Sequence, residues 1–245
     1  MPIRGDSTVA EIVAAYPAAP TLFEVVGIDY CCQPSRTLRD ACASAAMHLE
    51  DVVEFLERGA SPPATAGPAV GADARLSDLT REIKSFYHRR ARISLASMIW
   101  AARALASAHS DKIPVLWDIR RKIEELAHDL IPHMMREERY LFPYIDGMDL
   151  GRVENDAVVP LFGTVEYPLQ QIRHDHSHDE QALGVLRALT QNFVSSESAC
   201  ARQKDLYSSL AQFSADLEAH IRLENDVLFP RAVAMEKQLI EKARA

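Results

Sequence analysis

Residues 133–143 read HMMREERYLFP, and residues 220–230 read HIRLENDVLFP. Both stretches place a glutamate four residues after a histidine and Leu-Phe-Pro at the same later offset, so the chain contains an internal repeat. On an α-helix, residues i and i+4 share one face, with Cβ atoms roughly 5–6 Å apart. Each stretch therefore predicts a helix that presents an imidazole and a carboxylate together. The Leu-Phe-Pro segments are interpreted as core and helix-end residues, not as site residues.

Two further histidines precede the repeats at matched distances. His88 lies 45 residues before His133, and His176 lies 44 residues before His220, so the same helical hairpin is expected twice. The candidate metal ligands are then His88, His133, Glu137, His176, His220 and Glu224. Four imidazoles and two carboxylates favour a redox-active iron pair over structural zinc, which usually takes cysteine and four closed ligands. A single His-x-x-x-Glu is common on helix surfaces, but two matched copies favour a metal site.

The third expected helix offers three histidines within five residues. His174 and His178 share a face, whereas His176 points roughly the other way, so one helix cannot present all three to a single site. The matched spacing favours His176, and we expect the other two to be exposed to solvent. Asp129 and Asp175 could orient ligands or relay protons, or they are ordinary solvated carboxylates.

The pattern of apolar residues predicts an all-α protein with an up-down four-helix bundle. Long helices are expected at about 77–109, 115–146, 166–193 and 199–240, and no strand-like alternation competes with them. Pro132 falls inside the second helix and is expected to kink it.

The expected domain organisation has two parts. Residues 1–58 predict a small helical domain, with a capping box at Thr8 and a second helix cap at Thr37. Residues 59–75 are rich in Pro, Gly and Ala and predict a linker, and residues 76–245 form the bundle domain.

The N-terminal domain contains a pair of adjacent cysteines, Cys31 and Cys32, in a loop before a helix. A helix N-terminus favours the thiolate, so a redox pair, a transient iron ligand or a link to a partner chain are the functional interpretations. The alternative is two buried small hydrophobic residues. Cys42 and Cys200 are expected to be packing residues within helices.

Composition and charge exclude several classes of protein. The net charge of −8 and the absence of a basic stripe argue against nucleic-acid binding. No run of 18 apolar residues predicts a membrane span, and Asp6 and Glu11 interrupt any signal-peptide pattern, so a cytoplasmic location with reduced cysteines is expected.

These motifs resemble the Repair of Iron Centres family of bacterial di-iron proteins. Its members join a small cysteine-bearing domain of ScdA type to a haemerythrin-like bundle. The resemblance covers nearly the whole chain and is carried by DYCC at 29–32, by 133–138, by 168–176 and by 216–231. It implies that the six candidate ligands hold two non-haem irons, bridged by both glutamates and by an oxo or hydroxo group.

The resemblance also implies a function. Members protect or restore iron–sulfur clusters damaged by nitric oxide or oxidants in the cytoplasm, either by giving up labile iron or by reducing nitric oxide at the diferrous pair. Nitric oxide or oxygen species and damaged iron–sulfur proteins would be the partners, and a homodimer stays open. The alternatives are a haemerythrin-like module that binds or senses oxygen or nitric oxide, and a structural bundle with adventitious zinc.

Overall fold

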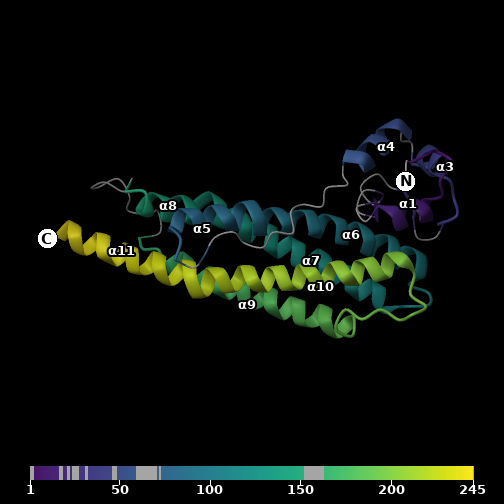
Figure 1. Ribbon diagram of the computed structural model, residues 1–245. Coiled ribbons are helices and arrows are strands. Elements are labelled where there is room, and N and C mark those ends of the chain that lie inside the picture. Colours follow the sequence, from purple (N-terminus) through teal and green to yellow (C-terminus); the bar gives the residue numbers. More distant parts are fainter. Residues whose placement is uncertain are drawn as a thin grey trace. The chain divides into compact units, whose positions relative to one another are not determined.

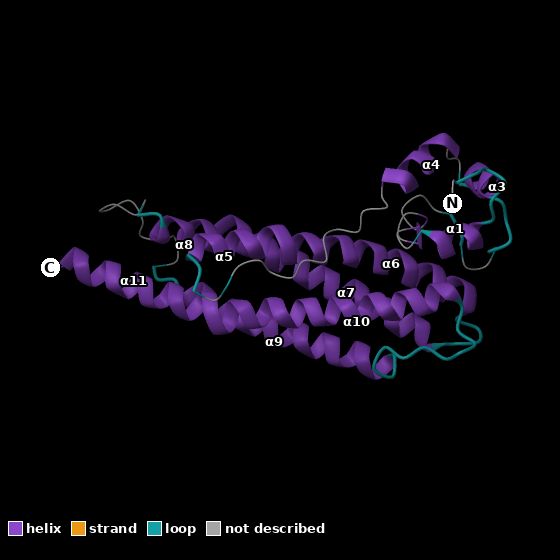
Figure 2. Cartoon of the chain, in the orientation of Figure 1, coloured by secondary structure: helices purple, strands orange, loops and turns teal. Residues whose placement is uncertain are grey.

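The computed structural model describes residues 3–16, 19–20, 23, 28–30, 33–45, 49–58, 71, 73–151 and 163–244. These residues form helices and no β-strand, with one isolated antiparallel bridge between Thr8 and Thr37 (Figure 2). The all-α fold class is therefore confirmed. None of the helices in this described part is long and apolar enough to cross a membrane.

The chain divides into two compact units. The first comprises 1–66, 96–120 and 193–210, and the second comprises 67–95, 121–192 and 211–245. Long helices contribute to both units, so this division does not follow the expected boundary after residue 58. Most of the expected linker, 59–75, lies outside the described residues, and the domain boundaries stay a prediction.

Within the first unit, three short helices near the N-terminus share an apolar core. They are α1 (Val9–Ala15), α3 (Leu38–Ser44) and α4 (Leu49–Arg58), labelled in Figure 1. The core consists of Val9, Ile12, Ala19, Phe23, Ile28, Tyr30, Leu38, Ala41, Cys42, Val52 and Leu56. A fully buried Val, Leu, Ile or Phe side chain contributes roughly 1.5–3 kcal/mol, and this burial stabilises helices that are too short to form alone.

Both expected helix caps are confirmed. The Thr8 N–H donates to Glu11 Oε2 at 2.9 Å, and the Glu11 N–H donates to Thr8 Oγ1 at 3.2 Å, which completes the capping box. Thr37 Oγ1 likewise accepts from the Asp40 N–H at 3.2 Å. These caps fix the start of α1 and α3 because they satisfy backbone donors that the helix itself leaves unpaired.

The rest of the described chain contains four long helical runs, close to the expected ranges (Figure 1). The first consists of α5 (Leu76–Glu82), η1 (Ile83–His88) and α6 (Arg89–His109), and the second of α7 (Val115–Arg136), η2 (Glu137–Leu141) and α8 (Phe142–Asp149). The third is α9 (Glu166–Leu189), and the fourth consists of α10 (Ala201–Arg222), η3 (Leu223–Leu228) and α11 (Phe229–Arg244). Pro132 lies inside α7, which continues to Arg136.

The segments η1, η2 and η3 are π-helical turns, which the sequence analysis did not predict. In two of them, the N–H of Phe142 donates to the carbonyl of Glu137, and the N–H of Phe229 donates to the carbonyl of Glu224. The interpretation of Leu-Phe-Pro as helix-end punctuation was wrong, because the helices continue into α8 and α11. Each proline follows a widened turn and occupies the start of a new α segment, where its missing N–H costs little.

In the second unit, one apolar cluster holds the helices around these π turns. It contains Leu76, Leu79, Ile83, Tyr87, Leu141, Phe142, Ile145, Met148, Val165, Leu169, Ile172, Leu228, Phe229 and Ala232. Polar contacts reinforce it. Glu236 accepts from Tyr144 Oη at 2.7 Å and from the Val165 N–H at 2.9 Å, which ties α11 to α8 and to the start of α9. The result is a rigid frame for the side chains that face the bundle interior.

Candidate metal centre

The six candidate ligands converge in the interior of the second unit, and none of their side chains is more than 2% exposed. They form two overlapping groups, and within each group the ligand atoms lie within 4.8 Å of one another. The first group is His88, Glu137, His220 and Glu224, and the second is His133, Glu137, His176 and Glu224. We call the first group the closed position and the second group the pocket-side position, because only the second adjoins a large cavity. Both glutamates belong to both positions.

Each glutamate turns one oxygen toward each position. Glu137 Oε2 lies 3.4 Å from His88 Nε2, and its Oε1 lies 3.3 Å from His133 Nε2. Glu224 repeats this arrangement: Oε1 lies 3.1 Å from His220 Nε2, and Oε2 lies 3.1 Å from His176 Nε2. Carboxylates placed in this way can bridge two ions.

The donor atoms fit cations better than they fit one another. Both oxygens of Glu137 and Glu224 and the Nε2 atoms of His133 and His176 are buried without a hydrogen-bond partner. His88 Nε2 and His220 Nε2 face each other at 3.2 Å, and because His88 Nδ1 donates to Glu138, a neutral His88 turns the lone pair of Nε2 toward His220. A buried carboxylate without a partner costs several kcal/mol. One cation in each position would satisfy all of these atoms.

Electrostatics among the protein groups lead to the same conclusion. Burial lowers the pKa of His133, but the negative charge of Glu137, whose Oε1 lies 3.3 Å from His133 Nε2, outweighs burial and raises that pKa to about 9. Burial raises the pKa of Glu224, yet the charges of His220 and His176 hold it well below its usual value. The two carboxylates thus stay ionised and draw positive charge into the centre, either as protons or as metal ions.

Three of the four histidines are oriented through their second ring nitrogen. His88 Nδ1 pairs with Glu138 Oε1 at 2.7 Å, and His133 Nδ1 with Asp175 Oδ2 at 3.4 Å. His176 Nδ1 pairs with Asn225 Oδ1 at 3.2 Å. Nδ1 donates in each pair, so Nε2 keeps its lone pair for a metal. Arginines hold the two acids: Arg92 contacts Glu138 at 3.0 Å, and Arg136 contacts Asp175 at 2.6 Å.

The orienting role considered for Asp175 is supported by this contact, whereas Glu138 and Asn225 were missed by the sequence analysis. A signal for them exists, because each directly follows a glutamate of the repeat, Glu137 or Glu224. On a helix, that position is rotated by about 100° from the glutamate and faces the neighbouring hairpin. Asp129, by contrast, pairs with His128 and His178, neither of which is a candidate ligand.

Aromatic rings pack against the imidazoles. Phe142 stacks on His88 with ring centroids 5.7 Å apart, and Phe229 stacks on His176 at 6.0 Å. Leu141, Phe142, Leu228 and Phe229 are buried core residues, as expected, and the two phenylalanines also contact the imidazoles without offering a ligand atom. Tyr87 stacks on His220 at 5.4 Å. The rings restrict imidazole rotation and keep water away from the centre.

Among the remaining candidate residues, the predicted burial is confirmed for the histidines and for Cys42, whereas Cys200 differs from the prediction. His174 and His178 are exposed and His176 is buried, as the helical spacing predicted. Cys31 and Cys32 lie outside the described residues, so their role stays a prediction. Cys42 is buried in the N-terminal core as expected, but Cys200 directly precedes α10 and is only half-buried. It was expected within the helix, and it lies instead at the start, where the first turn begins.

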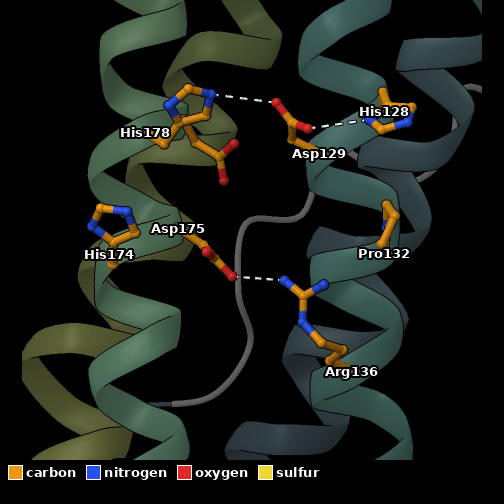
Figure 3. Close-up of a pocket in the computed structure, with 8 residues that line it drawn as sticks. His128, Asp129, Pro132, Arg136, His174, Asp175 and His178 are labelled. Carbon is orange, nitrogen blue, oxygen red and sulfur yellow. Dashed lines mark hydrogen bonds and ion pairs between the residues drawn. The ribbon is translucent and has the colours of Figure 1, made fainter.

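The pocket-side position adjoins a polar cavity of about 330 Å³ between α7 and α9 (Figure 3). Asp175, which contacts His133, lines it together with Asp179. Asp179 is 2% exposed, and burial raises its pKa to about 6 although the charges of His133 and His176 oppose this. The cavity beside the closed position, lined by Tyr87 and His220, has a volume of only about 10 Å³.

Comparison with known proteins agrees with this architecture. Residues 85–232 match the hemerythrin HHE cation binding domain, and residues 5–60 match the ScdA_N domain, a domain of unknown function. The fold and the buried His/Glu groups therefore define a hemerythrin-type cation-binding protein with an N-terminal ScdA_N domain.

Several similar proteins are named iron-sulfur cluster repair protein YtfE. The chain is 32% identical over 228 residues to the iron-sulfur cluster repair protein YtfE of Pectobacterium atrosepticum, covering 93% of this chain and 97% of that protein. It is 30% identical to the YtfE proteins of Musicola paradisiaca and Salmonella newport, over 93% and 94% of its length and 96% and 98% of theirs. The chain belongs to the family of iron-sulfur cluster repair proteins YtfE, which confirms the resemblance stated from its motifs.

Proposed function

We propose that the chain is a di-iron protein that repairs iron–sulfur clusters damaged by nitrosative or oxidative stress. One observation carries the proposal: two buried glutamates each turn one oxygen to two separate pairs of histidines, and none of these oxygens has a hydrogen-bond partner. Such a set suits two ions that share carboxylates. The relatives are named iron-sulfur cluster repair proteins, and this name indicates the target, damaged iron–sulfur proteins.

The proposed ligands are His88, His133, Glu137, His176, His220 and Glu224, with an oxo or hydroxo bridge between the irons. When bound, the iron pair supplies ferrous–ferric redox chemistry and open coordination for nitric oxide or oxygen species. Glu138, Asp175 and Asn225 hold the Nδ1 protons and so keep the Nε2 atoms available. Phe142 and Phe229 shield the imidazoles from water.

Two activities fit this site, iron donation to damaged clusters and reduction of nitric oxide. Iron donation is supported by the polar cavity beside the pocket-side position, because an ion that is delivered must leave the bundle. Reduction of nitric oxide would make the chain an enzyme. Cys31 and Cys32 are proposed to assist as a redox pair or as transient iron ligands. The proposed location is the cytoplasm, and a homodimer is compatible with the proposal.

The test starts with metal analysis and Mössbauer spectra of the isolated protein. Roughly two irons per chain with antiferromagnetic coupling are expected. The second step is anaerobic reactivation of a nitric-oxide-damaged iron–sulfur enzyme, compared with the Glu137→Gln variant. Zinc in place of iron, or equal reactivation by both proteins, would contradict the proposal. A stable oxygen adduct without reactivation would favour an oxygen-binding or sensing module instead.

A further inference from the structure

Arg202 is a buried cation that the metal centre does not use. It lies in the first turn of α10 and is only 3% exposed. A guanidinium at such depth loses the hydration of its charge, so its neighbours must compensate for that loss. Its contacts with Asp29, Tyr30 and Trp100 all lie within the first compact unit.

Two aromatic rings and one carboxylate provide this compensation. Arg202 Cζ lies 4.9 Å from the ring centroid of Tyr30 and 5.0 Å from that of Trp100, a residue of α6. Arg202 Nη2 donates to Asp29 Oδ1 at 3.2 Å. Arginine suits this position, because a planar guanidinium can lie over a ring while its edge still donates hydrogen bonds. One side chain of α10 thereby connects α6 with two consecutive residues of the N-terminal segment.

Tyr30 is held by a second residue of the same helix. It is only 2% exposed, and its hydroxyl forms a hydrogen bond with Asp205. Asp205 follows Arg202 by three residues, so the two side chains share one face of α10. Burial raises the pKa of Asp205, while the hydrogen bond from Tyr30 and the charge of Arg202 oppose that rise. The helix therefore contacts Tyr30 both at its ring and at its hydroxyl.

Stability alone does not account for a cation at this position. Arg202 Nε is buried and has no hydrogen-bond partner among the described residues. An unpaired buried donor is costly, and apolar side chains of similar volume often replace a buried ion pair without loss of stability. The residues that Arg202 holds are informative instead, because Asp29 and Tyr30 directly precede the adjacent cysteines of the sequence.

We propose that Arg202 is a positioning residue for the di-cysteine segment, residues 29–32. It holds Asp29 and Tyr30 against α10 and α6, and so fixes the point in the chain from which Cys31 and Cys32 follow. Only an ion pair, hydrogen bonds and ring contacts form or break when the segment is held or released. The inference rests on the proposed function, in which the cysteines act as a redox pair or as transient iron ligands, because a restrained thiol meets its reactant at a lower entropic cost.

The test measures alkylation of the full-length, iron-loaded protein with reduced cysteines under anaerobic conditions. Iodoacetamide is added, and mass spectrometry of the peptide that contains Cys31 and Cys32 gives the rate. We expect a rate about tenfold higher in Arg202→Ala and several-fold higher in Asp29→Asn, because the released segment opens more often. Arg202→Lys should lie between the wild type and Arg202→Ala, since it keeps the charge but not the planar group. Lys204→Ala removes an exposed cation from the same turn of α10 and is the matched control with the wild-type rate.

A double variant distinguishes positioning from general loosening. If Arg202 acts through Asp29, the combined Arg202→Ala and Asp29→Asn variant should be alkylated no faster than Arg202→Ala alone, whereas independent effects would multiply. Cys42 is buried in the N-terminal core, so its alkylation reports unfolding and should keep the wild-type rate. Wild-type rates in Arg202→Ala, multiplied rates in the double variant, or a parallel rise at Cys42 would each overturn the inference. Should Arg202→Ala fail to fold, Asp29→Asn at a half-buried carboxylate still provides the test.

A second measurement connects the anchor with repair. Arg202→Ala should retain the iron content of the wild type but reactivate a nitric-oxide-damaged iron–sulfur enzyme several-fold more slowly, and an unchanged reactivation rate would overturn the inference. Protein without iron, or Cys31→Ser and Cys32→Ser variants that reactivate like the wild type, would overturn the proposed function or the role of the cysteines in it. The alkylation rates would still report whether Arg202 holds the segment, so the two failures are distinguishable.

Discussion

The two candidate metal positions share both glutamates but differ in the groups that contact the far side of their histidines. The pocket-side position adjoins a polar cavity of about 330 Å³, whereas the cavity beside the closed position holds only about 10 Å³. His133 is backed by Asp175 at 3.4 Å, and His88 by Glu138 at a shorter 2.7 Å. A nearly symmetric ligand set thus has unequal surroundings. The sequence repeat can therefore provide equivalent ligands for two ions, while the neighbouring helices decide which of the two ions can exchange with solvent.

The largest expected effect is the loss of metal from both positions at once. Replacing Glu137 by Gln takes one bridging carboxylate from both positions and leaves the other glutamate alone among four histidines. We expect the metal content to fall from roughly two ions per chain to less than one. Plasma mass spectrometry of the purified variant measures this, and Glu180→Gln, which changes an exposed carboxylate on α9, serves as the control. A variant that retains both ions would show that the glutamate does not bridge.

The next largest expected effect is a pH dependence of the free energy of unfolding of the metal-free protein, prepared by removing the metal with a chelator. The pKa of His133 rises from 6.5 to about 9, so this group contributes stability that is present below pH 6.5 and lost as the pH rises through 9. Its size is on the order of 3 kcal/mol. Urea unfolding at pH 6.5 and at pH 9.5 measures it. His133→Ala should remove most of the difference, and an equal difference in that variant would assign the proton to another group.

Single-position variants sharpen the comparison. His133→Ala is expected to leave one ion in the closed position, and His220→Ala to leave one in the pocket-side position. A chelator should capture the ion of the His220→Ala variant about tenfold faster than the ion of the His133→Ala variant, because the pocket-side position adjoins the polar cavity. Stopped-flow absorbance of the chelator complex gives both rates. Equal rates, or faster release from the closed position, would mean that access does not depend on this cavity.

The smallest effect comes from the residues behind the histidines. Glu138→Gln and Asp175→Asn keep the shape of the side chain but remove its charge, so each should weaken binding at its own position by about tenfold. The Glu138 variant should lose more, since its contact with His88 is the shorter one. Competition with a chelator of known affinity measures both. A larger loss in the Asp175 variant would reverse the order of the two positions.

The sequence predicted the proposed ligands through helical spacing. His-x-x-x-Glu occurs twice with the same tail, and the matched distances to His88 and His176 select one histidine from three on α9. The structure buries His176 and exposes His174 and His178, because residues two apart on a helix point in roughly opposite directions. A ligand set on regular helices can be predicted in this way because the helix period fixes which side chains share a face.

Other features could not be predicted in this way because they depend on contacts between hairpins. Glu138 and Asn225 were missed because their partners, His88 and His176, lie 50 and 49 residues away. The π turns were missed because the hydrogen-bond shift at Glu137 and Glu224 leaves no mark in the apolar period. Leu-Phe-Pro was interpreted as a helix end because proline breaks a regular helix, yet the widened turn before each proline accommodates that residue.

The sequence by itself determined the all-α class, the two helix caps in the N-terminal unit and the set of six buried side chains, because each depends on local period or on a short-range hydrogen bond. Only the tertiary structure decided that each glutamate faces two positions, which acids stand behind the histidines and that one position adjoins a polar cavity. These features arise from the packing of helices that are far apart in the chain, and no local pattern of residues fixes that packing.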